Sequence, residues 1–361
     1  MYFKKVYIQN FRNYKEQKIE FDKKINIFLG KNAQGKTNIL ESLFIMGLGK
    51  SFRTNKDQDM IAFGEKNSKV ISVISDEEDK RETEIEINYL QEGKILKIDG
   101  HRLERSADLL ENIYIVVFSP DDLKIIKEGP ENRRRFLDRE LCQIKPVYYS
   151  DLGNYKKVLK QRNQLLRDKN KDLKLFEVFN ESLADYGTRI VKERENFTKR
   201  LQIISSDIHS KITSGQEKLE ILYETKVTEK EDYLINLEKG FENDLYRGHT
   251  SFGPHKDDIC IKINGTDIRD FGSQGQQRTA ALSMKLAEIG IIKQETGDNA
   301  VLLLDDVLSE LDKTRQQYLI EAMKDIQVFI TATDIDEDLR HKLPKGNTYF
   351  VDNGTVNIYN I

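Results

Sequence analysis

Hydrophobic and polar residues alternate through most of the first hundred residues of the chain. The alternating segments are 3–8, 17–21, 25–29, 68–74, 82–89 and 93–98. A period of two is typical of β-strands that bury one face, and it favours antiparallel pairing. The continuous apolar run at 113–118 instead indicates a strand that is buried on both faces.

The pattern becomes helical from Pro130 to about Leu245, where Lys, Glu, Asn and Leu dominate and Gly and Pro are few. Two long helices are predicted, at 147–167 and 173–211. The region is too short for a long coiled-coil arm, so we expect a largely α-helical second domain.

Strands and helices alternate again after residue 258. We predict, in order, a strand at 259–263 before an Asn264-Gly265 turn, a helix at 276–293, a buried strand at 301–304, a helix at 313–324, a strand at 327–331 and a terminal hairpin of 348–351 and 355–358. Together with the earlier segments this predicts an α/β protein with mixed sheets.

Composition narrows the class of protein. The chain has 361 residues, of which 38% are hydrophobic and 33% charged, and its formal net charge is −3. This length suits two domains, and the charge argues against a protein that coats nucleic acid indiscriminately while allowing local basic patches. The two cysteines match no metal spacing, and neither a signal peptide nor a membrane span is evident, so we expect a cytoplasmic protein.

A phosphate-binding pattern, G-x-x-x-x-G-K-[ST], lies between a predicted strand and a predicted helix. Its glycines let backbone N–H groups turn toward phosphate oxygens, Lys36 reaches the β- and γ-phosphates, and the Thr37 hydroxyl suits Mg²⁺. The helix that follows directs the positive end of its dipole at the same anion. The residues expected to bind the nucleotide are Gly30, Lys31, Asn32, Ala33, Gln34, Gly35, Lys36, Thr37 and Asn38.

Two carboxylates, Asp305 and Asp306, follow the apolar strand 301–304. Beside a phosphate loop, the first acid is expected to hold Mg²⁺ and the second to orient or deprotonate the attacking water. The alternative is a pair of solvated turn acids. Upstream, Ser273 can cap the helix that follows it, and Gly275 permits close approach to an anion.

The order of these motifs, followed by Ser309-Glu310-Leu311-Asp312, resembles the ABC-type ATPase head. Asn10-Phe11-Arg12 is similar to the entry of the SMC branch, and further segments resemble the RecF family of bacterial recombination mediators nearly end to end. These segments are 49–54, 118–123, 129–138, 253–258, 273–278 and 304–307. The resemblance implies an ATPase domain of residues 1–120 and 295–361, and a helical domain of residues 121–294 that carries the signature motif.

The resemblance also implies roles for single residues. Lys36, Asp305 and Asp306 would be catalytic, Thr37 and Asp305 would hold Mg²⁺, and Arg12 would lie near the phosphates of ATP. The signature that caps the nucleotide of a second subunit would be Ser273, Gln274, Gly275 and Gln276, and the loop at the dimer seam would contain Ser309 and Asp312.

The function that the resemblance implies is an ATP-dependent homodimer that binds duplex DNA and single-strand/double-strand junctions in replication, repair, recombination and the SOS response. RecR would be its partner, with RecO and RecA acting in the same pathway, and no membrane would take part. The candidate DNA contacts are Arg53, Lys156, Lys160 and Arg167, although a solvated helix face remains an alternative for the last three. A transporter's ATPase subunit and a metabolic phosphoryl-transfer enzyme are the other functions considered.

The resemblance implies an ATPase that DNA stimulates, and three departures from ABC heads favour slow hydrolysis. Position 306 is Asp where most heads have Glu, Thr331-Ala332-Thr333-Asp334 replaces a segment with a histidine, and Asp121 or Asp122 stands in for a glutamine. His255 is either a catalytic or metal-binding residue, or a structural one in a turn.

Overall fold

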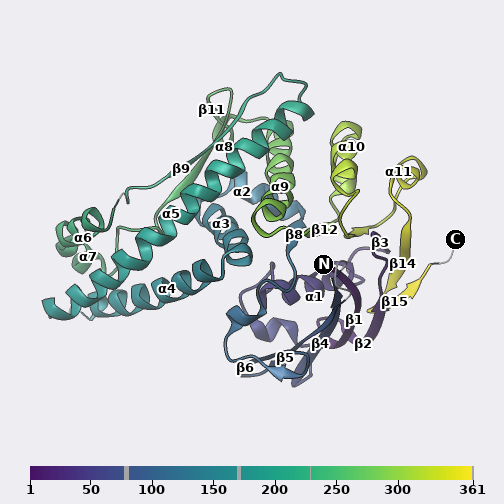
Figure 1. The fold of residues 1–361 in the computed structure, drawn as a ribbon, viewed down its shortest axis with the longest axis horizontal. Helices are drawn as coiled ribbons and strands as arrows, with labels where there is room; N and C mark the ends of the chain where they lie inside the picture. Colours follow the sequence, from purple (N-terminus) through teal and green to yellow (C-terminus); the bar gives the residue numbers. More distant parts are fainter. Residues whose placement is uncertain (77–80, 169–171, 228, 360–361) are drawn as a thin grey trace. The chain divides into compact units, whose positions relative to one another are not determined.

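The structure, a computed structural model, describes residues 1–76, 81–168, 172–227 and 229–359. The chain divides into unit 1, Met1–Asp122 with Lys285–Ile361, and unit 2, Leu123–Met284 (Figure 1). The second boundary, between Met284 and Lys285, lies within helix α9 (Gln274–Thr296), ten residues before the boundary expected at 294/295.

An antiparallel sheet forms one layer of unit 1. Its strands in the described residues are, in spatial order, β2 (Tyr14–Glu20), β1 (Tyr2–Phe11), β4 (Asn67–Ser75), β5 (Glu82–Leu90), β6 (Gly93–Ile98) and β7 (His101–Arg102). Along β5 the apolar residues Ile85, Ile87 and Tyr89 are buried, while the residues between them are more exposed. The pairing and the burial pattern therefore confirm the prediction of antiparallel strands with one face exposed to water.

A second, mostly parallel sheet forms the other layer. Its described strands are, in spatial order, β15 (Thr355–Ile358), β14 (Gly346–Asp352), β3 (Ile25–Leu29), β13 (Val328–Ala332), β12 (Val301–Asp305) and β8 (Ile115–Phe118). β15 is the antiparallel edge strand. All residues of β12 and β13 are buried, as continuous apolar runs predict. Because β3, β12 and β13 are parallel, their carboxyl ends meet at one edge of the sheet, where ligands bind in such folds.

Helix α1 (Lys36–Leu48) contacts strands of both sheets, and nearly all of its residues are buried. A helix that is apolar on all sides belongs in a protein interior. This packing fixes the position of its first turn relative to the carboxyl ends of β12 and β13. The remaining short elements of unit 1 are η1 (Asp57–Met60), η2 (Ser106–Leu109), η3 (Pro120–Asp122), η4 (Leu308–Glu310), α10 (Lys313–Ala322) and α11 (Glu337–Lys342).

Unit 2 is mainly helical. Its elements are α2 (Leu123–Lys127), α3 (Pro130–Ile144), α4 (Pro146–Arg167), α5 (Leu173–Ile212), β9 (Leu219–Glu224), α6 (Lys230–Lys239), α7 (Phe241–Arg247), β10 (Asp258–Ile263), β11 (Thr266–Asp267) and α8 (Ile268–Phe271), followed by the first part of α9. The predictions of α4 and α5 are confirmed. The helical prediction is wrong at β9, which pairs antiparallel with β10 and buries Leu219 and Ile221.

Among the described residues, no helix combines the length and the apolar composition needed to cross a bilayer.

Candidate nucleotide-binding and hydrolysis site

The loop between β3 and α1 is braced by the turn between β1 and β2. Asn13 Nδ2 donates a hydrogen bond to Gln34 O (2.9 Å), and the Tyr14 hydroxyl donates to Gly35 O (3.0 Å). Gly35 has a φ of 112°, and a Cβ at this position would lie 2.6 Å from Asn13 Nδ2. The second glycine of the motif is therefore required both by its left-handed backbone and by the close approach of the turn.

A cavity of about 280 Å³ opens beside this loop. It is lined by Asn32, Ala33, Gly35, Lys36, Thr37, Asn38, Arg53 and Asp306. Lys36 is buried, and its ammonium donates to Gly30 O (2.7 Å) and Lys31 O (3.1 Å). The structure thus brings the predicted lysine and the predicted base into one cavity, although they are far apart in the sequence.

The predicted metal ligands also meet. Thr37 Oγ1 donates a 2.8 Å hydrogen bond to Asp305 Oδ1, joining the start of α1 to the end of β12 across 268 residues. A hydroxyl and a carboxylate oxygen are the kinds of donor that Mg²⁺ prefers. The donor set therefore fits a magnesium ion at this edge of the sheet.

Asp306 directly follows β12 and is half-buried. Its φ of 54° lies in the left-handed region, which aspartate adopts more readily than most residues. Burial raises the pKa of its carboxyl above the ordinary value, while the nearby Lys36 ammonium opposes that rise. A raised pKa makes this carboxylate a better proton acceptor than a solvated aspartate.

Glu41, on α1, is a buried residue that the sequence did not single out. Its carboxylate accepts hydrogen bonds from Arg12 Nε (2.8 Å) and Nη2 (2.7 Å) and, at 3.3 Å, from Arg53 Nη1. Arg53 Nη1 also donates to Asn38 Oδ1 (2.7 Å). Arg12, predicted near the phosphates, is thus tied to Glu41, whereas Arg53, predicted at the DNA, lines the nucleotide cavity. A lone Glu within an apolar helix was the signal that could have revealed this cluster.

Ser273 caps α9, as predicted. Gln276 N donates to Ser273 Oγ (3.2 Å), and Ser273 N donates to Gln276 Oε1 (2.9 Å), which forms a capping box. This segment belongs to unit 2, whereas the residues that line the cavity belong to unit 1. In unit 1, Asp312 caps α10 through Arg315 N (3.0 Å), and Ser309 Oγ donates to Asp306 O (3.0 Å).

The basic residues of α4 separate into two groups. Lys156, Lys160 and Arg167 are exposed, and Lys156 lies 3.4 Å from Asp138. Arg162 is fully buried, and its guanidinium pairs with Asp244 at 2.9 Å. The three α4 residues that were predicted as DNA contacts are therefore exposed, whereas Arg162 on the same helix is part of the interior.

His255 is held inside unit 2 by both of its ring nitrogens. The Tyr155 hydroxyl lies 2.6 Å from Nδ1, and Thr250 O lies 3.0 Å from Nε2. Because a carbonyl can only accept, Nε2 carries the proton and Nδ1 accepts from the tyrosine. Burial lowers the pKa of His255 to about 4. In the described part of the chain, no cluster of three or more His, Cys, Asp or Glu side chains could hold a metal ion, which favours the structural interpretation.

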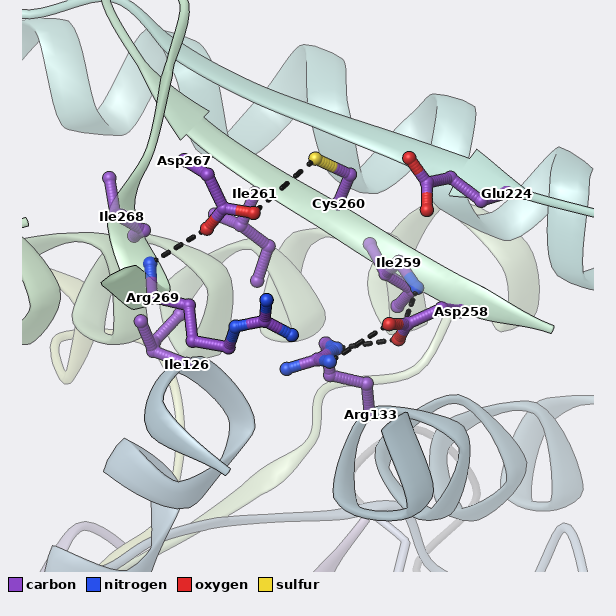
Figure 2. Close-up of a pocket in the computed structure, with 10 residues that line it drawn as sticks. All are labelled: Ile126, Arg133, Glu224, Asp258, Ile259, Cys260, Ile261, Asp267, Ile268 and Arg269. Atoms are coloured by element: carbon purple, nitrogen blue, oxygen red, sulfur yellow. Dashed lines mark hydrogen bonds and ion pairs between the residues drawn. The ribbon is translucent and has the colours of Figure 1, made fainter. Parts of the chain in front are cut away.

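A smaller cavity of about 120 Å³ lies within unit 2. Figure 2 shows that, of the charged side chains that line it, Arg133 and Asp258 form an ion pair. Arg133 forms two hydrogen bonds to Asp258 (2.6 and 2.9 Å), Asp267 accepts from Arg269 N (2.8 Å), and Cys260 Sγ lies 4.0 Å from Asp267. These contacts connect α3, β10 and α8, and we assign no ligand to this cavity.

Comparisons with known proteins agree with this geometry. Residues 2–342 match the family model described as the RecF/RecN/SMC N terminal domain. The DNA replication and repair protein RecF of Clostridium kluyveri is 46% identical, with 99% of each chain covered. RecF of Alkaliphilus oremlandii is 43% identical over 96% of this chain and 97% of that protein.

Solved structures also match this chain to RecF. The recombination mediator protein RecF with ATP, in the RecFOR pathway, superposes with a TM-score of 0.92 at 39% identity and covers 99% of this chain and 98% of its own. An SMC head domain from Pyrococcus furiosus shares the fold alone, with a TM-score of 0.57 and 17% identity. The predicted ABC-type, SMC-like ATPase head is thereby confirmed, and the chain belongs to the RecF family of DNA replication and repair proteins.

Proposed function

We propose that the chain is a cytoplasmic, ATP-dependent DNA-binding protein that dimerises when it binds ATP. The dimer would bind duplex DNA at gaps and junctions and release it when ATP is slowly hydrolysed. The contact between Thr37 and Asp305 carries this proposal, because it unites the phosphate loop and the strand acid in one donor set. Membership of the RecF family supports the DNA function and favours it over a transporter subunit or a metabolic enzyme.

The chain's own residues suit hydrolysis of the terminal phosphate. Lys36 would bind the β- and γ-phosphates, and Thr37 and Asp305 would hold Mg²⁺, which would neutralise phosphate charge when bound. Asp306 would take a proton from the water whose oxygen attacks the γ-phosphorus as the bond to the β-phosphate oxygen breaks. Asp is shorter than Glu by one C–C bond, about 1.5 Å, so we expect slow turnover.

Dimerisation follows from the division of the site. The cavity is lined by unit 1 of one copy, and we propose that the signature, Ser273 to Gln276, caps it from a second copy. ATP that contacts both copies would then stabilise the dimer by mass action.

Sizing the protein by light scattering with ATP and with ADP tests this. We expect dimers with ATP and monomers with ADP. Ser273→Arg should abolish the dimer while ATP still binds, whereas Ser210→Arg, at an exposed position of α5, should not. Monomers of the parent chain under both nucleotides, or a dimeric Ser273→Arg variant, would exclude the shared site.

For DNA, we propose that Lys156, Lys160 and Arg167 on α4 follow the phosphate backbone. Removing Lys160 and Arg167 together should weaken duplex binding at all sequences and lower the slope of log K against log salt by about one to two units. Gel shifts on duplex, single-stranded and junction DNA, with ATP, measure this. An unchanged slope would favour a solvated helix face.

Two further features of the proposal rest on family membership. Duplex DNA should accelerate ATP hydrolysis, which phosphate release with and without DNA would measure. RecR should bind the DNA-bound dimer, with RecO and RecA acting downstream; ATP-dependent co-sedimentation with purified RecR tests the direct contact.

A further inference from the structure

Thr331 lies beside the two consecutive acids of the site, Asp305 and Asp306. It belongs to β13, opposite Asp305 in the parallel pairing with β12, and it is fully buried. Its hydroxyl donates to Asp305 Oδ1 (2.8 Å), the same oxygen that accepts from Thr37. The backbone N–H of Asp306 donates to that hydroxyl (3.0 Å). One side-chain oxygen is therefore bonded to both acids.

The second of these bonds acts on an unusual backbone. Asp306 has a φ of 54°, which is disfavoured for residues with a side chain unless the surroundings hold it. Its N–H is also 3.2 Å from Thr331 O, so the side chain and main chain of Thr331 fix the turn together. This turn determines the direction in which the Asp306 carboxylate leaves the chain, and that carboxylate lines the cavity.

We propose that Thr331 is a positioning residue for ATP hydrolysis, whose hydroxyl sets the orientation of Asp305 and Asp306 relative to each other. The proposal rests on the function proposed above, hydrolysis of ATP in this cavity. Thr331 acts through the two acids, because it is bonded to both and is not one of the residues that line the cavity. Removing its hydroxyl should therefore slow the chemical step and leave the binding of ATP nearly unchanged.

Two substitutions separate the hydroxyl from the shape of the side chain. Thr331→Val keeps the branched shape and removes the donor and the acceptor, while Thr331→Ser keeps both. We expect kcat to fall about 10- to 100-fold in the valine variant, the usual effect of losing an outer partner of a metal ligand. ATP affinity should stay within about threefold, because this bond orients the acids and does not hold the substrate. The serine variant should recover most of the rate.

The assay is phosphate release at saturating ATP over a titration of Mg²⁺, with ATP binding measured separately. Half-activation of the valine variant should need more Mg²⁺, since Asp305 loses an orienting bond. Thr83→Val, on β5, is the matched control and should behave as the parent chain does. A folded valine variant that fails to bind ATP would contradict the proposed role; if the valine variant fails to fold, the serine variant decides, because it retains the hydroxyl.

Full activity in Thr331→Val, or a serine variant as slow as the valine variant, would overturn this role for Thr331. A parent chain whose hydrolysis is absent, or is indifferent to Asp306→Asn, would overturn the proposed function and this inference with it. Loss of activity in Asp306→Asn together with full activity in Thr331→Val would overturn the inference alone.

Discussion

Replacing Glu41 by Gln should destabilise the ATPase unit without weakening its hold on ATP. The Glu41 side chain is fully buried and accepts two short hydrogen bonds from Arg12, whose side chain is 20% exposed. It also faces Arg53, whose side chain is 42% exposed, at 3.3 Å. The substitution keeps the shape of the side chain and removes the one negative charge that the two guanidinium groups share.

The free energy of unfolding lost in Glu41→Gln should be smaller than the loss from breaking a fully buried ion pair. Removing one partner of such a pair costs about 3–5 kcal/mol, because the other charge is left unpaired and dry. Here Arg12 and Arg53 keep some access to water, so we expect a loss of about 2–4 kcal/mol in the free energy of unfolding. Nucleotide affinity should hold or rise, since the cavity beside Arg53 then carries one more net positive charge.

Urea unfolding followed by circular dichroism measures the loss, and hydrogen exchange of the peptide 36–48 localises it to α1. A double-mutant cycle with Arg12→Gln should give a coupling energy of about 2 kcal/mol. The matched control is the pair Lys211 and Asp207 on α5, whose charged atoms are 2.6 Å apart with both side chains more than 60% exposed. Its coupling should stay below about 0.5 kcal/mol.

The reasoning fails if Glu41→Gln unfolds at the same urea concentration as the parent chain while its ATP affinity drops. Glu41 would then act on the nucleotide directly, and its role would not be to hold the loop with Arg53 and the turn with Arg12 against α1. Equal coupling energies for the buried and the exposed pair would also contradict it, because burial is what makes the two pairs different.

Three other outcomes follow from the site and its supports. Because burial raises the pKa of Asp306, kcat should fall on the acid side at a higher pH than for a solvated aspartate, which a pH–rate profile with Asp306→Asn as the blank would show. Burial lowers the pKa of His255 to about 4 from an ordinary 6.5, so the free energy of unfolding should be highest above pH 6.5 and fall by up to about 3 kcal/mol as the pH drops toward 4. Urea unfolding of the parent chain at a series of pH values should show this contribution, and the His255→Gln variant should lack it. Gly35→Ala should abolish nucleotide binding, measured by fluorescence of a labelled ATP, because the added Cβ would lie 2.6 Å from Asn13 Nδ2 at a φ that disfavours side chains. Gly100→Ala is the control: it has the same kind of left-handed backbone but open space around the added Cβ, so it should show the effect of backbone strain without the clash.

The sequence was sufficient for the parts of the site that depend on local structure. A phosphate loop is continuous in the chain, so its spacing alone carries the prediction. The meeting of Thr37 with Asp305 could also be expected, because parallel strands in such folds end at a common edge. The prediction failed at β9, where a short segment with alternating apolar residues lies among long helices and only its pairing with β10 makes it a strand.

The contacts that support the site were not predictable in the same way. Lys160 and Arg162 are two residues apart on α4, and one is exposed while the other is buried against Asp244. Helical periodicity separates the two faces, but only packing decides which face is inside. The link between Thr331 and Asp305 likewise depends on the register of β13 against β12, which brings them side by side.

This register also bears on the identity of the base. Asp306 is held at a φ of 54°, where a short acidic side chain is tolerated better than a long one, and its N–H is bound by Thr331. A glutamate would reach about 1.5 Å further toward the attacking water, but it lacks the local hydrogen bonding that lets Asp occupy this region. The short base, the left-handed backbone and the buried hydroxyl therefore depend on one another. If hydrolysis is slow as we propose, it would follow from how this turn is built, and we expect that lengthening the base alone would not make it fast.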